Sequence, residues 1–172
     1  MIITTERLTI RFVYESDWRA IRNIMTDFSV SEYAQYDRAN DLSDFAVHSR
    51  ISKWASAADG NDHIFFAVCL KDMVIGYITF NIREVGYETG YCFHSAYHGK
   101  GYAKESFTAL LGYMKALGAA QIYAGTAIKN LPSVRLLKSV GFELYETEKV
   151  SFYKDENGNN IFFDGGIFKL KF

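Results

Sequence analysis

The spacing of hydrophobic residues predicts a strand, two helices and a loop in the first third of the chain. Apolar residues fall on every second position of 8–12, which is the period of a half-buried strand. Over 18–28 and again over 45–54 they recur at helical spacing. Residues 29–44 have neither period, and the sequence predicts a loop there.

The rest of the chain adds six strands and two helices. The apolar runs at 63–71 and 73–82 flank Lys71-Asp72 and predict a β-hairpin. The following elements are predicted in the order strand, helix, strand, helix, strand and strand, at 86–94, 103–117, 120–128, 130–141, 142–154 and 160–171. Asn157-Gly158 joins the last two strands and is a strong hairpin signal. This order predicts one α+β domain spanning residues 1–172, not a doubly wound sheet.

Composition narrows the class of protein. The chain has 172 residues, with 49 % hydrophobic and 23 % charged residues, which suits one soluble domain with a sizeable core. The net charge of −1 and the scattered Lys and Arg residues argue against nucleic acid as a partner. No apolar run approaches the ~18 residues of a membrane span, so we expect a cytoplasmic protein without a membrane partner. Cys69 and Cys92 lie in apolar runs and are predicted to be free thiols.

Residues 98–103 form the most informative turn, because a strand there ends in a glycine-rich stretch that enters a helix. The first N–H groups of a helix have no intrahelical partner and the helix dipole adds positive charge, so phosphate suits this position. Gly99 and Gly101 lack a Cβ and allow phosphate oxygens to approach the backbone. Lys100 and Lys104 add positive charge, or are simply exposed lysines in a solvated turn.

Two well-known kinds of phosphate-binding turn are excluded because their sequence motifs are missing. A dinucleotide fingerprint needs a third glycine, where this chain has Lys104, and an acid in the next strand, where 119–127 contains none. The Gly-x-x-x-x-Gly-Lys-Ser/Thr string of a P-loop is missing from the sequence. Two interpretations remain from the residues alone: a turn that binds a phosphorylated cofactor through main-chain amides, or an ordinary tight connection.

Four motifs in order resemble the GNAT family of acyl-CoA N-acyltransferases. The family's cofactor turn, Gln or Arg followed by x-x-Gly-x-Gly/Ala, matches 98–103, with His98 in the first position. Three other stretches resemble the branch of ribosomal-protein N-terminal acetyltransferases: "TERLTIRFVYESDW" (5–18), "YETGYCF" (87–93) and "KNLPSVRLLKSVGFE" (129–143). The resemblance implies the acyl-CoA N-acyltransferase fold, a central mixed, mostly antiparallel twisted sheet of about seven strands flanked by four helices.

The resemblance also implies a cofactor site. In this family acetyl-CoA is the co-substrate and lies in a V-shaped split between the fourth and fifth strands. Its pyrophosphate sits on the turn and its pantetheine pairs with the fourth strand. The cofactor-binding residues implied here are Phe93, His98, Gly99, Lys100, Gly101, Tyr102, Ala103, Lys104 and Asn130. The amine substrate attacks the thioester directly, without an acyl-enzyme.

Three residues are candidates for the chemistry. Glu88 matches a family glutamate that deprotonates the amine, and partial burial among aromatic rings would raise its pKa; the alternative is a solvated strand glutamate. Asn130 is expected to cap its helix and to contact pantetheine. Ser133 is expected to donate a hydrogen bond to the sulfur or to orient water. His94 and His98 do not share a helix face, and no metal is expected.

The sequence thus predicts an acetyl-CoA-dependent N-acetyltransferase. A protein N-terminal α-amine is one expected acceptor, and a small amine such as a polyamine, an amino sugar or an amino acid is another. A non-catalytic acyl-CoA-binding module is the alternative from a different class. The sequence leaves open whether the protein forms a homodimer.

Overall fold

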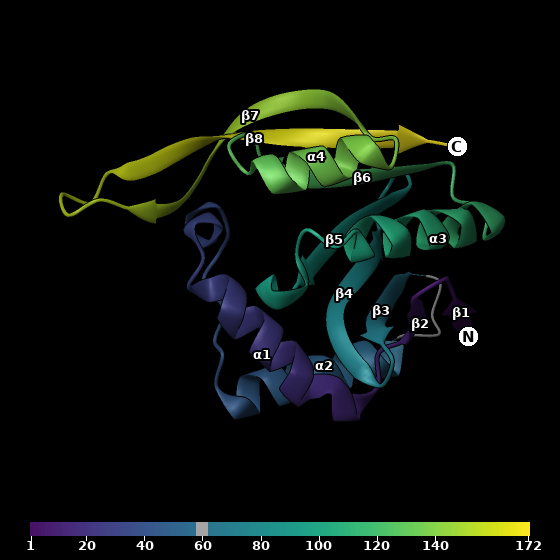
Figure 1. Ribbon diagram of the computed structural model, residues 1–172. Coiled ribbons are helices and arrows are strands. Elements are labelled where there is room, and N and C mark those ends of the chain that lie inside the picture. Colours follow the sequence, from purple (N-terminus) through teal and green to yellow (C-terminus); the bar gives the residue numbers. More distant parts are fainter. Residues whose placement is uncertain (58–61) are drawn as a thin grey trace.

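The computed structural model describes residues 1–57 and 62–172 and contains eight strands within them (Figure 1). The strands are β1 (Ile2–Thr4), β2 (Leu8–Phe12), β3 (His63–Leu70), β4 (Met73–Ile82), β5 (Tyr87–Phe93), β6 (Gln121–Ala127), β7 (Glu143–Lys154) and β8 (Asn160–Lys171). The α-helices are α1 (Trp18–Ser29), α2 (Asp44–Ala57), α3 (Tyr102–Ala116) and α4 (Leu131–Ser139). Short 3₁₀ turns are η1 (Glu15–Asp17), η2 (Glu32–Tyr36) and η3 (Ser95–Tyr97).

All eight strands form one sheet in the order β1-β2-β3-β4-β5-β6-β8-β7. Each neighbouring pair is antiparallel except β5 and β6, which are parallel. The predicted α+β class and the mixed, mostly antiparallel sheet with four helices are therefore confirmed. The strand beyond the expected seven is β1, an edge strand of three residues that is too short to show an alternation.

The helices cover both faces of this sheet. One core lies between the sheet and α3 and α4, and a second lies between the sheet and α1 and α2. In β3, Ile64 and Phe66 belong to the first core, whereas Phe65 and Ala67 belong to the second. A strand that is buried on both faces is a continuous apolar run rather than an alternating one, which explains its composition.

The predicted loop at 29–44 is irregular except for η2, and α2 starts at its end. The sequence predicts that the second helix runs out near 57–62; residues 58–61 of that stretch lie outside the described residues.

The C-terminal hairpin of β7 and β8 projects from the body of the molecule and reaches over the loop that contains η2 (Figure 1). The Tyr153 hydroxyl donates a hydrogen bond of 2.7 Å to the Asp37 carbonyl oxygen. The rings of Tyr36 and Phe163 meet edge to face with their centroids 5.3 Å apart. These contacts join two segments of the chain that are more than a hundred residues apart.

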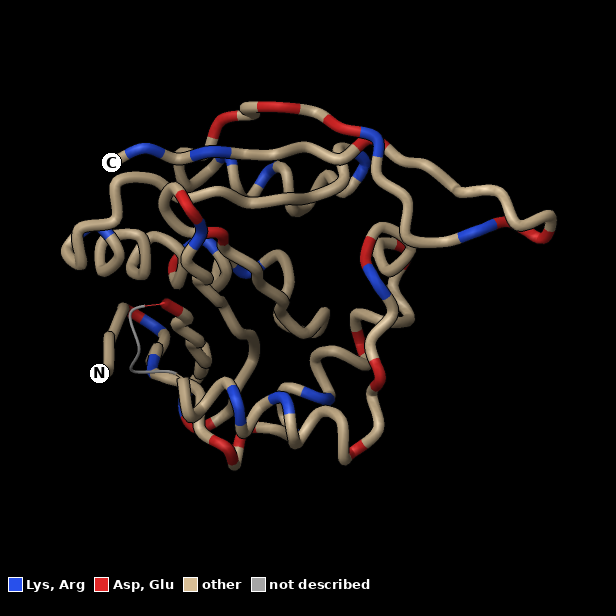
Figure 2. The backbone as a smooth tube through the Cα atoms, turned by 180° about the vertical axis from the view of Figure 1, so that it is seen from behind, with Lys and Arg blue, Asp and Glu red and all other residues tan. Residues whose placement is uncertain are grey.

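Charges are spread over the fold. Lys and Arg are scattered among Asp and Glu over the whole tube in Figure 2, and neither sign is confined to one part of the chain. Within the described residues, no helix combines the length and the apolar character needed to cross a membrane.

Candidate active site

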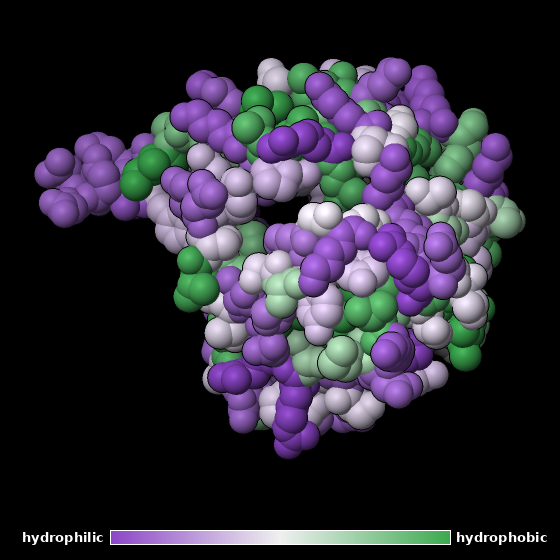
Figure 3. Space-filling view, in the orientation of Figure 1, coloured by the Kyte–Doolittle hydropathy of each residue, from purple (hydrophilic) through white to green (hydrophobic). Residues whose placement is uncertain are grey.

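The site is created where β5 and β6 separate. These strands pair only at Tyr87–Ile122 and Glu88–Tyr123, whereas β5 pairs with β4 along its whole length. Beyond Glu88 the backbone groups of β5 that face β6 have no partner in the ladder, and buried or half-buried backbone groups need one. The separation opens a cleft of about 1210 Å³, visible in Figure 3 as a dark hollow near the centre of that face.

The cleft brings together residues that the sequence marks as candidates. Nearly all predicted cofactor-binding residues line it, namely Phe93, His98, Gly99, Gly101, Tyr102, Ala103, Lys104 and Asn130, together with the catalytic candidates Glu88 and Ser133. Lys100 is the exception, because its ammonium donates to the Ala96 carbonyl oxygen at 3.0 Å. Residues from β5, α3 and α4 thus share one cavity.

The glycine-rich turn enters α3 in a left-handed conformation. Gly99 has φ +73° and Gly101 has φ +80°, a region that is costly for any residue with a Cβ. Within the helix the first N–H that reaches an intrahelical acceptor belongs to Glu105, which donates to the Gly101 carbonyl oxygen at 3.0 Å. The preceding amides at 102–104 lie at the positive end of the helix dipole, and this arrangement suits an anionic phosphate group.

A cluster around Arg7 holds this turn, and the sequence motifs did not reveal it. The Arg7 guanidinium donates to the Lys100 carbonyl oxygen at 2.9 Å and forms an ion pair with Glu105 in the first turn of α3. Thr5 donates to the same carboxylate at 2.6 Å. Burial raises the pKa of Glu105, but the hydrogen bonds from Thr5 and Arg7 outweigh it and the pKa is lowered.

The Arg7 cluster also orients the turn. In a trans peptide the C=O and the following N–H point in opposite directions. Because the Lys100 carbonyl oxygen is directed at Arg7, the N–H of Gly101 is directed away from Arg7. On the other side of the turn, a ring nitrogen of His98 lies 2.8 Å from the Phe93 carbonyl oxygen and ties the turn to the end of β5.

Glu88 sits at the point where β5 and β6 part. Its carboxylate is paired with the Arg83 guanidinium, whose Nε lies 2.8 Å from Oε2, and 44 % of its side chain is exposed. Glu88 therefore lies beside a cation and is partly open to solvent, between the partly buried glutamate and the solvated strand glutamate that the sequence allows. The ion pair places the positive charge of Arg83 beside this carboxylate.

Ser133 lies in the first turn of α4, as expected. The Asn130 side chain accepts a hydrogen bond from the Ser133 backbone N–H at 3.3 Å, which is the predicted helix cap. The Ser133 hydroxyl lies 2.6 Å from the hydroxyl of Tyr91 on β5. Burial raises the pKa of Tyr91 to about 12, even though the bond with Ser133 opposes the shift. Tyr91 was not among the candidates from the sequence, because nothing local marks a strand tyrosine as functional.

Neither cysteine is set up as a nucleophile. Cys69 is buried, Cys92 is half-buried, and both are free thiols. Burial raises the pKa of Cys92 to about 12, so its thiol stays protonated at neutral pH, and a protonated thiol is a weak nucleophile. Among the described residues, no group of three or more His, Cys, Asp or Glu side chains is placed to hold a metal ion.

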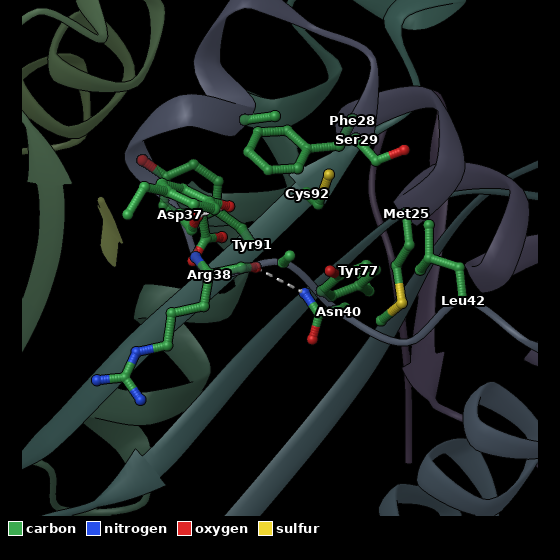
Figure 4. Close-up of a pocket in the computed structure, with 13 residues that line it drawn as sticks. Met25, Phe28, Ser29, Asp37, Arg38, Asn40, Leu42, Tyr77, Tyr91 and Cys92 are labelled. Atoms are coloured by element: carbon green, nitrogen blue, oxygen red, sulfur yellow. Dashed lines mark hydrogen bonds between the residues drawn. The ribbon is translucent and has the colours of Figure 1, made fainter. Parts of the chain in front are cut away.

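A smaller pocket of about 170 Å³ adjoins the cleft on the side of α1 (Figure 4). Phe28, Asp37, Tyr91 and Cys92 line both spaces. Asn40 also lines this pocket, and its side-chain amide donates a hydrogen bond of 3.4 Å to the Arg38 carbonyl oxygen, drawn as a dashed line in Figure 4. The pocket therefore extends the cleft toward the loop that carries η2.

Similarity to known proteins identifies the family of this chain. The sequence model of a family described as "Acetyltransferase (GNAT) domain" matches residues 7–143. The chain belongs to the GNAT acetyltransferase family. The resemblance seen in the sequence is thereby confirmed, and this GNAT protein is an acetyl-CoA-dependent acyltransferase.

Relatives and solved structures agree with this assignment. The chain is 32 % identical over 146 residues to the uncharacterized N-acetyltransferase YnaD of Bacillus subtilis (strain 168), covering 82 % of each protein. A solved GNAT-family acetyltransferase from Bacillus anthracis has 27 % identity and a TM-score of 0.79, over 99 % of this chain and 98 % of that one.

The acetyltransferase from Salmonella typhimurium described as modifying the N-terminal serine of ribosomal protein L7/L12 has a TM-score of 0.85, over 100 % of this chain and 99 % of that one. At 15 % identity this likeness concerns the fold alone.

Proposed function

We propose that this GNAT protein transfers the acetyl group of acetyl-CoA to a primary amine by direct attack within a ternary complex. The observation that carries the proposal is the parting of β5 and β6 after Glu88, because it opens a cleft that runs to the amides of a glycine turn. The cleft offers one continuous space for a long cofactor and an acceptor that meet near Ser133.

The cofactor would lie along the backbone of β5 and end on the turn. The amides at 99–104 would hold the pyrophosphate, with Lys104 adding positive charge at the cleft wall. The backbone of β5 near Phe93, which lies beyond the last residue paired with β6, would pair with pantetheine, and Asn130 would contact its thiol end. Lys100 contributes its main chain to this set, because its ammonium is turned to Ala96.

The chemistry requires no covalent intermediate on the protein. The amine nitrogen forms a bond to the thioester carbonyl carbon, the carbon–sulfur bond breaks, and the electron pair stays on the sulfur of CoA. Glu88, which is paired with Arg83, would accept the proton of the amine directly or through water. The Ser133 hydroxyl would donate a hydrogen bond to the departing sulfur. The protonated thiol of Cys92 supports direct attack, since it is a poor nucleophile.

For the acceptor we propose the α-amine of a protein N-terminus. The acid residues on the cleft wall, Asp27, Glu32, Asp37, Glu88 and Glu148, favour a cationic acceptor. An α-amine has a pKa of about 7.7–8.0, against about 10.4 for lysine, so roughly a tenth of it is already neutral at pH 7 and it needs less help from a base than lysine does. A fold neighbour that modifies an N-terminal serine supports the same acceptor class.

The test is release of free CoA from acetyl-CoA in the presence of a peptide library with varied N-termini, measured against polyamines, aminoglycosides and amino acids. Turnover with peptides, blocked when the peptide α-amine is formylated beforehand, is the expected result. Turnover only with small amines would replace the N-terminal acceptor by the small-molecule alternative. Tight CoA binding without any product would favour the non-catalytic module.

A further inference from the structure

Tyr91 and Ser133 come from opposite arms of the split cleft. Tyr91 belongs to β5, beyond the last residue that pairs with β6, and Ser133 belongs to α4, which follows β6. Their hydroxyl oxygens are 2.6 Å apart although the residues are 42 positions apart in the chain. Both residues line the cleft, so this hydrogen bond bridges the two arms where the strands have already separated.

The tyrosine ring is held on its other side. It meets the ring of Phe107 on α3 edge to face, with centroids 4.9 Å apart and an angle of 89° between the rings. Phe107 is fully buried in the core between the sheet and α3. The ring of Tyr91, and with it the position of its phenol oxygen, is therefore held by rigid elements.

The direction of the bond decides what Ser133 can do. A serine hydroxyl has one proton and accepts through its lone pairs, so it can donate to the cleft only if Tyr91 is the donor of the shared bond. A phenol whose pKa is about 12 keeps its proton at neutral pH and can therefore be the donor of this bond, which the geometry allows in either direction. The serine proton is then free to point at a third atom.

We propose that Tyr91 is a positioning residue, which donates to the Ser133 hydroxyl and so aims the serine proton at the sulfur of CoA. This inference rests on the proposed placement of the thioester beside Ser133. No proton has to pass along the pair: the sulfur departs as a thiolate, and the aligned hydrogen bond stabilises its negative charge. Hydrogen bonds to charged groups are stronger than those between neutral groups, which is why orientation of a single hydroxyl affects the rate.

The first experiment measures the thiol pKa of bound CoA from thiolate absorbance at a series of pH values, and needs no acceptor. In the wild-type protein the pKa should lie about one unit below that of free CoA, the shift that corresponds to about a tenfold preference for bound thiolate. In Tyr91→Phe and in Ser133→Ala the shift should disappear. Tyr91→Phe removes the hydroxyl and keeps the ring that packs against Phe107. Tyr113→Phe is the matched control, because Tyr113 lies on α3 with its ring against Phe66, and this variant should behave as wild type.

The second experiment compares leaving groups with any amine that the wild type acetylates. Tyr91→Phe should lower kcat for acetyl-CoA about tenfold, with KM for the amine unchanged, and have little effect on a thioester of a more acidic thiol. Tyr91→Phe combined with Ser133→Ala should be no slower than either single variant, because the two residues act as one unit. Ser133→Thr, with Tyr91 unchanged, should retain most of kcat for acetyl-CoA, because threonine keeps the hydroxyl.

Two results would overturn the inference. One is a bound-thiol pKa that is the same in wild type and Tyr91→Phe; the other is an equal loss of rate with both leaving groups, which indicates a structural tie between the arms. Failure of the proposed function gives a different pattern, namely a wild-type protein that shifts the thiol pKa of CoA but transfers no acetyl group to any amine.

Discussion

The glycine turn permits a matched test of cofactor binding, because the chain has a second glycine in the same backbone conformation on the same helix. Gly101 precedes α3 with φ +80°, and Gly118 follows α3 with φ +89°. A Cβ at Gly118 would meet nothing within 4 Å, and one at Gly101 would lie 3.3 Å from a guanidinium nitrogen of Arg7, the end of a flexible side chain. Alanine at either position therefore suffers chiefly from its left-handed φ.

The two alanine variants should lose similar stability and differ in binding. Left-handed backbone costs an L-residue about 1–2 kcal/mol, so each Tm should fall by roughly 2–8 °C. In Gly101→Ala the strain should rotate the peptides to which we assign the pyrophosphate. Loss of one hydrogen bond to a charged group, about 1.5–3 kcal/mol, should raise the Kd for acetyl-CoA roughly 10- to 150-fold. Gly118→Ala should leave that Kd within about twofold of wild type.

Calorimetric titration with acetyl-CoA below the Tm of each variant provides the measurement. If Gly101→Ala bound acetyl-CoA as tightly as wild type while its Tm fell as in Gly118→Ala, the amides of this turn would not hold the pyrophosphate. Equal weakening in both variants would show that strain in α3, rather than contact with phosphate, controls the affinity.

Three further predictions concern charged groups. Glu88→Gln should lower the rate most at low pH, where little amine is neutral, whereas the exposed Glu84→Gln should not; a uniform loss across pH would indicate a positional role for Glu88. Asp17→Ala should lower the free energy of unfolding by about 3–5 kcal/mol in urea titrations, because it leaves the largely buried guanidinium of Arg11 without its carboxylate partner. A loss under about 1 kcal/mol would contradict this. The fold lowers the pKa of Glu105, so its ionised carboxylate stabilises the protein above the unfolded pKa of about 4.3, and this stabilisation is lost as pH falls. The free energy of unfolding of Glu105→Gln should therefore be lower than that of wild type at neutral pH and approach it toward about pH 3. A difference in the free energy of unfolding that does not change with pH would exclude this linkage.

Local patterns predicted most of the fold and part of the site. The hairpin around Lys71-Asp72 and the one across Asn157-Gly158 are both present, and Lys71 and Gly158 have the positive φ that tight turns require. The position of Glu88 in β5 was predictable, but its partner was not. Arg83 directly follows β4, and the pairing of β4 with β5 brings this end of β4 beside Glu88. The register of two strands follows from their hydrophobic pattern and from the geometry of the turn, not from the identity of either residue.

By itself, the sequence determined most of the strands and the four α-helices, where the chain turns, and that a glycine turn starts the third helix. These features depend on neighbours within a few positions, so periodicity and turn chemistry suffice. Only the tertiary structure decided that β5 and β6 part after Glu88, that Arg7 holds the glycine turn, and that Tyr91 contacts Ser133. Such contacts join elements that are far apart in the chain, and their distances follow from how the helices and strands pack, which no local pattern specifies.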